Sequence, residues 1–483
     1  MCPIWPLHLI ILYVLALCPL WVVCQAMPSL TAVFEPNSTS VNMDEEVYVD
    51  VNVWGDGMQV GDQLNLLSEH PVLVGAEWNS TYTLTEEHIN NNNTFKGIMR
   101  VRGIFLGHSN LTMEVTRSSQ SQAVEGFMPV IVLRPQRPID TVFVTSVALF
   151  ISLIFINFGC AMDWPTVKGV LRRPVGPAIG MLGQFVFMPL MSFGLGFLIF
   201  PNFPAMRLGM FFTGVAPGGG ASNVWTFILG GNLNLSLAMT TISTLASFAF
   251  MPAWLFSLGQ VVFRNANIVV PYQRIGTFVV GLVVPLGVGL AMQRWTPRLA
   301  AFMVRILKGF STTLLLFIIV FAIATNLYIF QLFTWEIYVA GMGLPWLGYT
   351  FGYLIARVLK QPHADALAIS IETGVQNTGI AIFLLRYALG QPEADLTTVI
   401  PVSVAIMTPV PMTCIFIYQK IRACIDNRRG KHKEMLEEDA TPSGTTPDQS
   451  IVAAIDLTGE KDLADRVGDK KPELAVSVVD NAA

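Results

Sequence analysis

The chain has 483 residues, of which 53% are hydrophobic and only 13% are charged. Soluble globular proteins carry about 25% charged residues, so this composition indicates an integral membrane protein. The formal net charge of −4 gives no reason to expect a nucleic-acid partner. The six cysteines form no CxxC pair and no Cys/His ligand set, which argues against zinc binding and thiol redox chemistry.

Residues 1–26 are typical of a secretory signal peptide. An apolar core runs from Leu9 to Val23, and Cys24 and Ala26 supply the small residues of a cleavage site. The segment lacks the usual basic residues before its core, so an uncleaved signal-anchor helix is the alternative. Both interpretations place the following segment outside the cytoplasm.

Residues 27–138 are polar, and we expect them to form a small antiparallel β-sandwich-like domain. Residues 47–54 alternate with a period of two, and 94–105 and 111–115 also have the pattern of strands. Four N-glycosylation sequons behind a signal sequence predict an extracellular, glycosylated domain. Their asparagines are Asn37, Asn79, Asn92 and Asn110.

Residues 139–422 form the predicted transmembrane domain. Its apolar segments, each long enough to cross a bilayer, are roughly 140–161, 175–199, 206–229, 234–258, 270–293, 304–330, 336–358, 366–388 and 396–420. With the preceding domain outside, an odd number of spans places the C-terminus in the cytoplasm. The loops that would then be cytoplasmic hold most of the flanking Lys and Arg, as the positive-inside rule requires. Residues 423–483 are polar, which predicts a disordered cytoplasmic tail.

Glu372 lies in an otherwise uncharged apolar stretch, residues 367–385. A carboxylate at the centre of a bilayer costs about 2.5–3.5 kcal/mol on insertion scales, so it must face the bundle interior, a partner or a bound cation. The polar side chains around it bear oxygen and are not basic: Ser370, Thr373, Gln376 and Asn377. Such oxygens suit a hard monovalent cation, and the sequence therefore predicts sodium as the partner of Glu372.

Two of the predicted spans are interrupted in a similar way. Residues 215–223 read VAPGGGASN, and residues 372–379 read ETGVQNTG. Glycine runs and proline break a helix, and broken backbone at membrane depth is tolerated only where it is buried in protein or lines a cavity. Paired interruptions point to the binding site of a secondary transporter. The alternative is that the glycines merely allow close helix packing.

Other polar residues in the spans fit the same site. Ser236 and Thr240 share one helix face, as do Glu372 and Gln376, because each pair is four residues apart. Gln184 lies in the middle of another span. Alone, the hydroxyls would bond their own helix and Gln184 would join two helices. Together they could complete two oxygen cages that share one carboxylate.

These motifs resemble the bile acid:sodium symporter family. The resemblance rests on residues 217–223, 270–285 and 372–377, and it covers about 140–420. Within the family the chain is most similar to an orphan branch with a long extracellular N-terminal domain. The resemblance implies an all-α polytopic membrane domain of about nine helices, since the first of the family's ten is absent here. It also implies inverted repeats with two crossed, discontinuous helices.

The resemblance further implies two sodium sites. The first would consist of Ser222, Asn223, Ser236, Thr240 and Glu372. The second would consist of Gln184, Glu372, Thr373, Val375 and Gln376, with Thr373 and Val375 contributing backbone carbonyls. These two residues differ from the common family residues, but a carbonyl ligand does not require a particular side chain.

The leading hypothesis is a sodium-coupled symporter of an amphipathic organic anion, similar to a bile acid or a sterol conjugate, that works by alternating access in the plasma membrane. Half-helix ends would bind the anionic group. The alternative is an orphan receptor or adhesion protein whose N-terminal domain binds an extracellular partner, with a vestigial transporter domain. The sequence has no Ser/His/Asp set, paired acid–base carboxylates or Walker loop, so we do not expect an enzyme.

Overall fold

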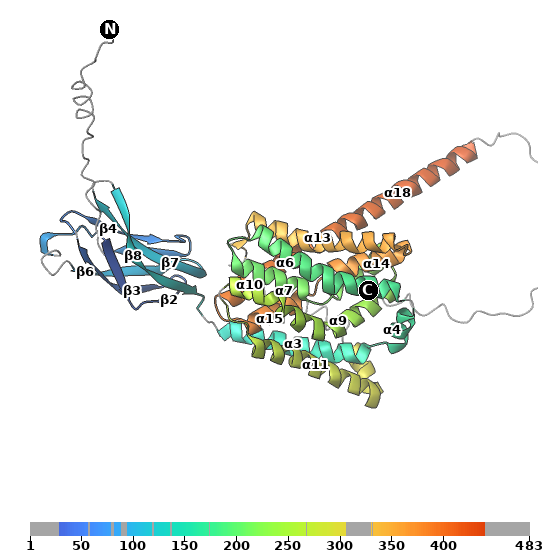
Figure 1. The fold of residues 1–483 in the computed structure, drawn as a ribbon. Coiled ribbons are helices and arrows are strands. Elements are labelled where there is room, and N and C mark those ends of the chain that lie inside the picture. The colour runs from blue at the N-terminus through green and yellow to red at the C-terminus, as the bar shows by residue number, and fades with distance from the viewer. Residues whose placement is uncertain are drawn as a thin grey trace, which may run out of the picture. The chain divides into compact units, whose positions relative to one another are not determined.

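The computed structural model describes two kinds of architecture, a β-rich N-terminal domain and a helical bundle (Figure 1). The described part runs from residue 29 to residue 439, with gaps at 57, 79–81, 88–93, 118–119, 136–137, 173, 267, 306–329 and 331. The expected signal peptide and almost all of the span expected at 304–330 therefore lie outside the described residues. The same holds for the sequon asparagines Asn79 and Asn92.

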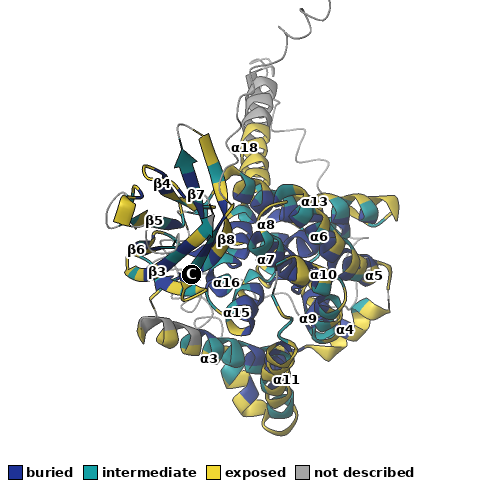
Figure 2. Ribbon diagram, turned by 60° about the vertical axis from the view of Figure 1, so that its left-hand side comes forward, coloured by how far each residue is buried: buried dark blue, intermediate teal, exposed yellow. Residues whose placement is uncertain are grey.

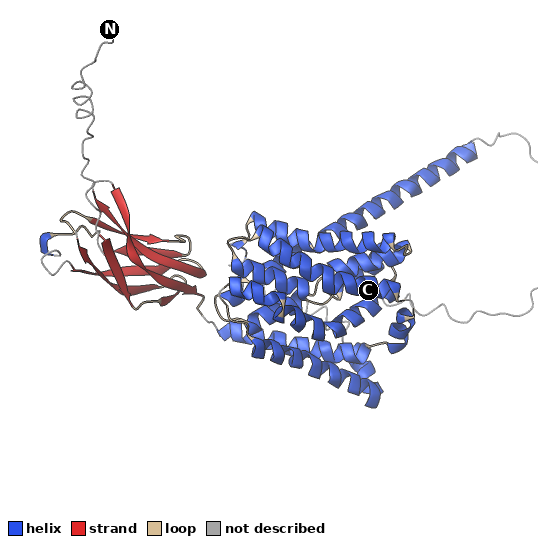
Figure 3. Ribbon diagram, viewed as in Figure 1, coloured by secondary structure: helices blue, strands red, loops and turns tan. Residues whose placement is uncertain are grey.

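Strands dominate the N-terminal domain (Figure 3). They are β1 (Ser29–Glu35), β2 (Thr39–Asn42), β3 (Glu46–Asp56), β4 (Gln63–Ser68), β5 (Val74–Trp78), β6 (Thr94–Gly103), β7 (Gly107–Arg117) and β8 (Gln120–Leu133). They pair in the order β4-β7-β8-β1-β3-β6-β5, with β2 beside β8. Because β1 pairs with β8 only at Thr31 and Glu125, the sheet divides into two layers at that point.

The two layers enclose one apolar core. Buried side chains alternate along β6, where Phe95, Met99 and Val101 are fully buried, and they pack with Val51 of β3 and Leu111 of β7. This alternation is the pattern that the sequence predicted, so the expectation of a β-rich domain is confirmed. The expectation of purely antiparallel pairing is wrong, because β1 and β2 both run parallel to β8.

The rest of the described chain is helical. The helices are α3 (Pro138–Ala161), α4 (Trp164–Leu171), α5 (Val175–Leu182), the π-helical turn η1 (Gly183–Phe187), α6 (Met188–Ile199), α7 (Pro204–Val215), α8 (Ala221–Leu229), α9 (Leu233–Phe256), α10 (Leu258–Asn265), α11 (Tyr272–Trp295), α13 (Trp335–Val358), α14 (His363–Gly374), α15 (Thr378–Ala388), α16 (Glu393–Leu396), α17 (Val399–Met407) and α18 (Pro409–Asp439). Figure 2 shows α7 almost entirely buried, whereas exposed residues run along α11.

Within the described residues, four helical stretches are long and apolar enough to cross a membrane. They are Val175–Ile199, Leu233–Phe256, Tyr272–Trp295 and Glu393–Asp426. The pair Thr145–Ala161 and Trp164–Leu171, bent by 72°, is a fifth candidate. A polytopic membrane domain is therefore confirmed, and the number of nine spans stays a prediction.

The last helix corrects one expectation. Residues 423–439, which we expected to belong to a disordered tail, continue α18 without a break. The segment contains two Lys, two Arg and three Glu, which favour helix, and Arg422 pairs with Asp426 one turn away at 3.8 Å. Residues 440–483 lie outside the described part.

Candidate cation-binding site

The two interrupted helices meet at their breaks. α7 and α8 are separated by residues 216–220, and α14 and α15 by residues 375–377. The Gly219 amide donates to the Val375 carbonyl at 2.8 Å, and the Asn377 amide donates to the Pro217 carbonyl at 2.8 Å. These bonds satisfy backbone groups that the breaks would leave unpaired in an apolar environment. The interruptions expected from the sequence are therefore present, and they cross.

Four helix ends meet at this crossing. The C-terminal ends of α7 and α14 carry partial negative charge, which favours a cation. The N-terminal ends of α8 and α15 carry partial positive charge, which favours an anion. One small region of the molecule thus offers fields of both signs.

Glu372, in the last turn of α14, lies inside the crossing and is only 2% exposed. Its Oε2 accepts hydrogen bonds from Ser222 Oγ at 2.5 Å and from Thr240 Oγ1 at 2.9 Å. Its Oε1 is buried and has no hydrogen-bond partner in the described part of the chain. No described Lys or Arg forms an ion pair with it. The two short hydrogen bonds to this carboxylate therefore both reach Oε2, and Ser243 is a third hydroxyl neighbour.

Around Glu372 there are more hydrogen-bond acceptors than hydroxyl protons to fill them. Asn223 Oδ1 accepts from Ser236 Oγ at 2.9 Å and from Thr240 Oγ1 at 3.3 Å. The single proton of Thr240 lies within reach of Asn223 Oδ1, Glu372 Oε2 and the Ser236 carbonyl, the last at 3.0 Å. A hydroxyl has one proton to donate, so oxygen lone pairs remain in excess. All five residues expected for the first sodium site come together here.

Gln184 and Gln376 hold each other across the crossing. Gln184 Nε2 donates to Gln376 Oε1 at 2.8 Å and to the Ala216 carbonyl at 2.7 Å. Gln376 Nε2 donates to the Thr373 carbonyl at 2.9 Å and to Gln184 Oε1 at 3.3 Å. Gln184 therefore contacts both interruptions, and the residues expected for the second site are also neighbours.

The π-helical turn that carries Gln184 has an identifiable cause. Pro189 has no amide hydrogen, so the carbonyl of Phe185, four residues earlier, loses its usual helical partner. Trp254 Nε1 donates to that carbonyl at 2.8 Å instead. Local departures from α-helix of this kind often occur at functional sites.

The two backbone carbonyls expected in the second site are already engaged. The Thr373 carbonyl accepts from Gln376, and the Val375 carbonyl accepts from Gly219. The Thr373 hydroxyl bonds its own helix, at the Ile369 carbonyl. Each carbonyl keeps a second lone pair for a ligand. The second set is thus less open to a cation than the first.

The donor chemistry selects the type of ion. The site presents one carboxylate with hydroxyl, amide and carbonyl oxygens. Among the residues that the structure describes, no group of three His, Cys, Asp or Glu comes together. Zinc prefers nitrogen and sulfur ligands, and calcium sites collect several carboxylates. A single negative charge among neutral oxygens therefore fits a hard monovalent cation such as sodium.

Two residues of this neighbourhood were missed in the sequence. Thr226 Oγ1 donates to Ser236 Oγ at 3.3 Å, and Ser243 lies one turn beyond Thr240 on α9. The signal was present, because Ser236, Thr240, Ser243 and Ser247 follow the four–three spacing of one helix face.

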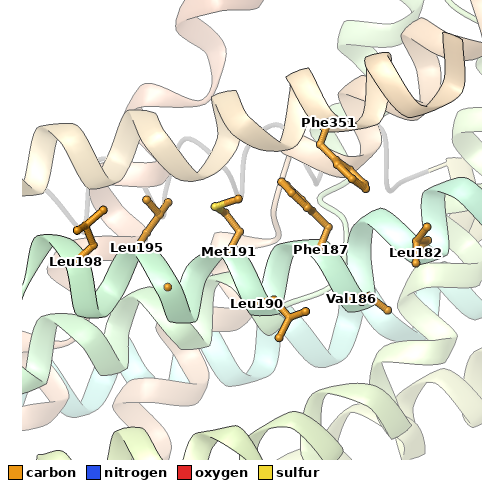
Figure 4. Close-up of a pocket in the computed structure, with 9 residues that line it drawn as sticks. Leu182, Val186, Phe187, Leu190, Met191, Leu195, Leu198 and Phe351 are labelled. Atoms are coloured by element: carbon orange, nitrogen blue, oxygen red, sulfur yellow. The ribbon is translucent and has the colours of Figure 1, made fainter. Parts of the chain in front are cut away.

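A larger groove of about 740 Å³ lies elsewhere, between α6 and α13 (Figure 4). All of its described lining residues are apolar: Leu182, Val186, Phe187, Leu190, Met191, Gly194, Leu195, Leu198 and Phe351. Phe187 and Phe351 stack with ring centroids 3.8 Å apart. These residues offer no ligand for an ion.

Two of the expected glycosylation sites lie in the described residues. Asn37 is exposed between β1 and β2. Asn110 is half-buried on β7, and its Nδ2 donates to Glu69 Oε2 at 2.8 Å. Modification of Asn110 would replace that contact, whereas Asn37 is open.

Known proteins are similar to this chain over its membrane region. Residues 148–332 match the profile of the Sodium Bile acid symporter family. The ileal sodium/bile acid cotransporter of Cricetulus griseus is 30% identical over 304 residues, which cover 62% of this chain and 85% of that protein. The sodium-dependent organic anion transporter of Bos taurus is 28% identical over 352 residues, 72% of this chain and 90% of that protein.

The human P3 protein is also similar, with 31% identity over 280 residues. The match covers 56% of this chain and 58% of the P3 protein. The chain therefore spans less than two thirds of the length of that relative.

Proposed function

The chain belongs to the sodium bile acid symporter family, and on that premise we propose that it is a secondary transporter that moves an amphipathic organic anion together with sodium. Its task would be transport rather than enzymatic catalysis. The similar proteins are named as a bile acid cotransporter and an organic anion transporter, which supports this class of substrate.

One observation carries the proposal. Glu372 is a buried carboxylate at the crossing of two broken helices, and one of its oxygens lacks a partner among the described residues. A membrane anchor has no need of such a group, because it destabilises the fold unless a cation faces it. Repeated broken helices with ions bound at their crossing are a feature of secondary transporters.

Sodium would be held by the two sets of residues described above. Ser222, Asn223, Ser236, Thr240 and Glu372 would supply the first set of oxygens. Gln184, Glu372, Gln376 and the carbonyls of Thr373 and Val375 would supply the second. Because Glu372 belongs to both sets, its charge would couple the occupancy of the two positions.

The same crossing supports an anionic substrate. The N-terminal ends of α8 and α15 carry partial positive charge there, which would attract an acidic head group. An amphipathic molecule such as a bile acid or a sterol conjugate would leave its apolar body against the surrounding helices. The bound sodium would offset part of the charge of the substrate, which favours binding of both together. Alternating access would then expose the crossing to each side of the membrane in turn.

The topology belongs to the same proposal. The N-terminal domain would be extracellular and glycosylated, the C-terminus cytoplasmic, and the protein located in the plasma membrane. A receptor or adhesion role for the N-terminal domain remains compatible with transport. A receptor or adhesion role as the sole function would not explain why Glu372 is buried.

An uptake assay tests the proposal. Cells that express the full-length protein are offered a panel of labelled bile acids, sulfated sterols and neutral sterols, in sodium buffer and in choline buffer. We expect saturable uptake of at least one anionic member in sodium alone. Uptake that is equal in both buffers, or confined to neutral sterols, would contradict sodium-coupled anion transport.

A further inference from the structure

A small cavity lies against Glu372, Gln184 and Ser243. Its volume is about 10 Å³, close to the space that a single water molecule or small ion needs. The remaining lining is apolar: Pro177, Gly180, Met181, Met239 and Ile242. The walls therefore leave little room for a hydration shell, and a cation here would be coordinated by protein oxygens.

Gly218, from the other interrupted helix, lies against the same two oxygens. A methyl group placed on Gly218 would lie 2.5 Å from Glu372 Oε1 and 3.2 Å from Ser243 Oγ. Only a residue without a side chain can approach both oxygens so closely. Glu372 Oε1 is the buried carboxylate oxygen that has no hydrogen bond of ordinary geometry among the described residues, so Gly218 and Ser243 flank the oxygen that a cation would bind.

The hydroxyl of Ser243 has two acceptors within reach. Its Oγ lies 3.1 Å from the Thr240 carbonyl, and it also neighbours the Glu372 carboxylate, to which it can donate. Whichever acceptor takes its single proton, the lone pairs of Oγ remain available to a cation. Ser243 is buried, at 3% exposure.

We propose that Ser243 is a further oxygen ligand of the cation at Glu372, and that with Glu372 Oε1 it forms an enclosed position that selects sodium by size. The inference rests on the proposed sodium-coupled function and adds a ligand to the two sets expected from the family resemblance. An enclosed position of this size disfavours a larger ion such as potassium, because the rigid packing of a protein interior resists expansion.

Titration of thermal stability tests the proposal. The purified full-length protein is heated at increasing concentrations of sodium, lithium or potassium chloride at constant ionic strength. Ser243→Ala removes the oxygen, and Ser243→Cys keeps the volume but replaces a hard ligand with a soft one. We expect both variants to need about 10-fold more sodium for half of the stabilisation. We also expect weaker discrimination between sodium and potassium.

Ser247→Ala is the matched control. Ser247 lies one turn further along the same face of α9, and its hydroxyl donates to the Thr244 carbonyl at 2.7 Å, but it does not line the cavity. The thermal stability of Ser247→Ala should rise with sodium concentration as that of the parent does. If Ser247→Ala weakens sodium binding as much as Ser243→Ala does, the effect belongs to α9 as a whole, and the proposal is wrong.

The outcomes separate this inference from the function on which it rests. If sodium stabilises the parent and both Ser243 variants titrate as the parent does, only the role of Ser243 is overturned. If sodium does not stabilise the parent at all, the proposed function fails and the ligand role falls with it. If Ser243→Ala does not fold, Ser243→Cys decides, since it preserves the packing.

Discussion

Glu372 occupies a position where a carboxylate is costly unless a cation faces it. Its Oε2 is held by Ser222 and Thr240, while its Oε1 has no partner among the described residues. Replacing the charge with a neutral group of the same shape should relieve that cost, because burial penalises the ionised form most strongly. The fold should therefore tolerate the change, whereas cation binding should not.

We predict that Glu372→Gln abolishes the thermal stabilisation that sodium gives the parent protein, without lowering stability in sodium-free buffer. The measurement is the unfolding temperature of the purified protein in sodium and in choline. Glu336→Gln serves as the control, because Glu336 lies in the first turn of α13 at the end of the helix. A sodium-dependent shift that survives in Glu372→Gln would show that Glu372 is not a ligand.

Sequence alone was sufficient to bring forward the candidate ligands but not their contacts. Glu372 stands out because a charge in an apolar span needs a reason, and Ser236 and Thr240 follow from helical spacing. The reciprocal bonds between Gln184 and Gln376 could not be predicted, since they join residues 192 positions apart. Ser243 was overlooked because a membrane helix commonly bonds serine to its own backbone, as it does here.

At the scale of the helices, the crossing depends on glycines that leave room for side chains of the other interruption. Gly218 faces Glu372, and Gly219 lies so close to the Gln376 carbonyl that a methyl group there would be 2.8 Å from it. Gly220 has nothing within 4 Å of such a methyl group. Neighbouring glycines in one motif thus differ in what they would tolerate.

We predict that Gly218→Ala destabilises the protein by about 1–3 kcal/mol, the usual cost of overpacking a rigid interior, and removes its response to sodium. The added methyl group would contact Glu372 Oε1 at 2.5 Å. Gly220→Ala is the matched control and should keep both properties. If the two variants show the same sodium-dependent shift in unfolding temperature, Gly218 does not pack against Glu372 as closely as the structure indicates.

A buried ion pair fixes β4 against β7 in the N-terminal domain. Arg117 donates through Nε and Nη2 to the two oxygens of Asp62, at 2.7 and 2.6 Å, and the side chain of Asp62 is only 2% exposed. Burial alone would raise the pKa of Asp62. The hydrogen bonds from Arg117 and the Gln59 amide, with the charge of Arg117, outweigh burial and hold that pKa below its usual range.

We predict that Asp62→Asn lowers the free energy of opening of β4 and β7 by about 3–5 kcal/mol, because it leaves Arg117 charged and without its carboxylate. The pKa of Asp62 is lowered in the fold, so its contribution is complete above about pH 4 and is lost as the pH falls further. The difference in the stability of β4 and β7 between parent and variant should therefore persist from pH 7 to about pH 4 and then narrow. Hydrogen exchange of β4 and β7 amides in the full chain measures it.

Glu77→Gln, at the exposed partner of Arg100, is the control for that experiment and should change exchange little, since solvent screens surface pairs. If Asp62→Asn exchanges like the parent at pH 7, the ion pair does not stabilise this edge of the domain.

The helix breaks could be predicted from sequence, but the π-helical turn could not. Residue type alone predicts both interruptions. One contains Pro217 followed by three glycines, and the other is flanked by Gly374 and Gly379. Near η1 the sequence offers Gly183 and Pro189, and neither residue predicts a π-helical turn in particular. The partner that decides this turn is Trp254, which comes from α9. The parallel pairing of β2 with β8 was missed for the same reason, since strand partners distant in sequence leave no local pattern.

The whole chain contains separate cores. In the described residues, the core of the β-rich domain draws only on side chains between Leu30 and Val132. The helical cores begin at Phe155 and share no residue with it. Every candidate sodium ligand also lies after residue 183. Each part therefore has its own source of hydrophobic stabilisation.

We predict that deletion of residues 30–132, behind the signal segment, leaves the sodium-dependent thermal stabilisation of the purified protein unchanged. The helical cores and the proposed ligands stay intact, so the free energy of sodium binding should not change. Glu372→Gln in the same truncated protein is the control and must remove the shift, which shows that the signal comes from the crossing. Loss of the shift in a truncated protein that remains monodisperse would make the β-rich domain part of the ion-binding machinery. In that case the β-rich domain would act on the crossing from a distance, and any molecule that binds this domain would become a candidate regulator of the crossing.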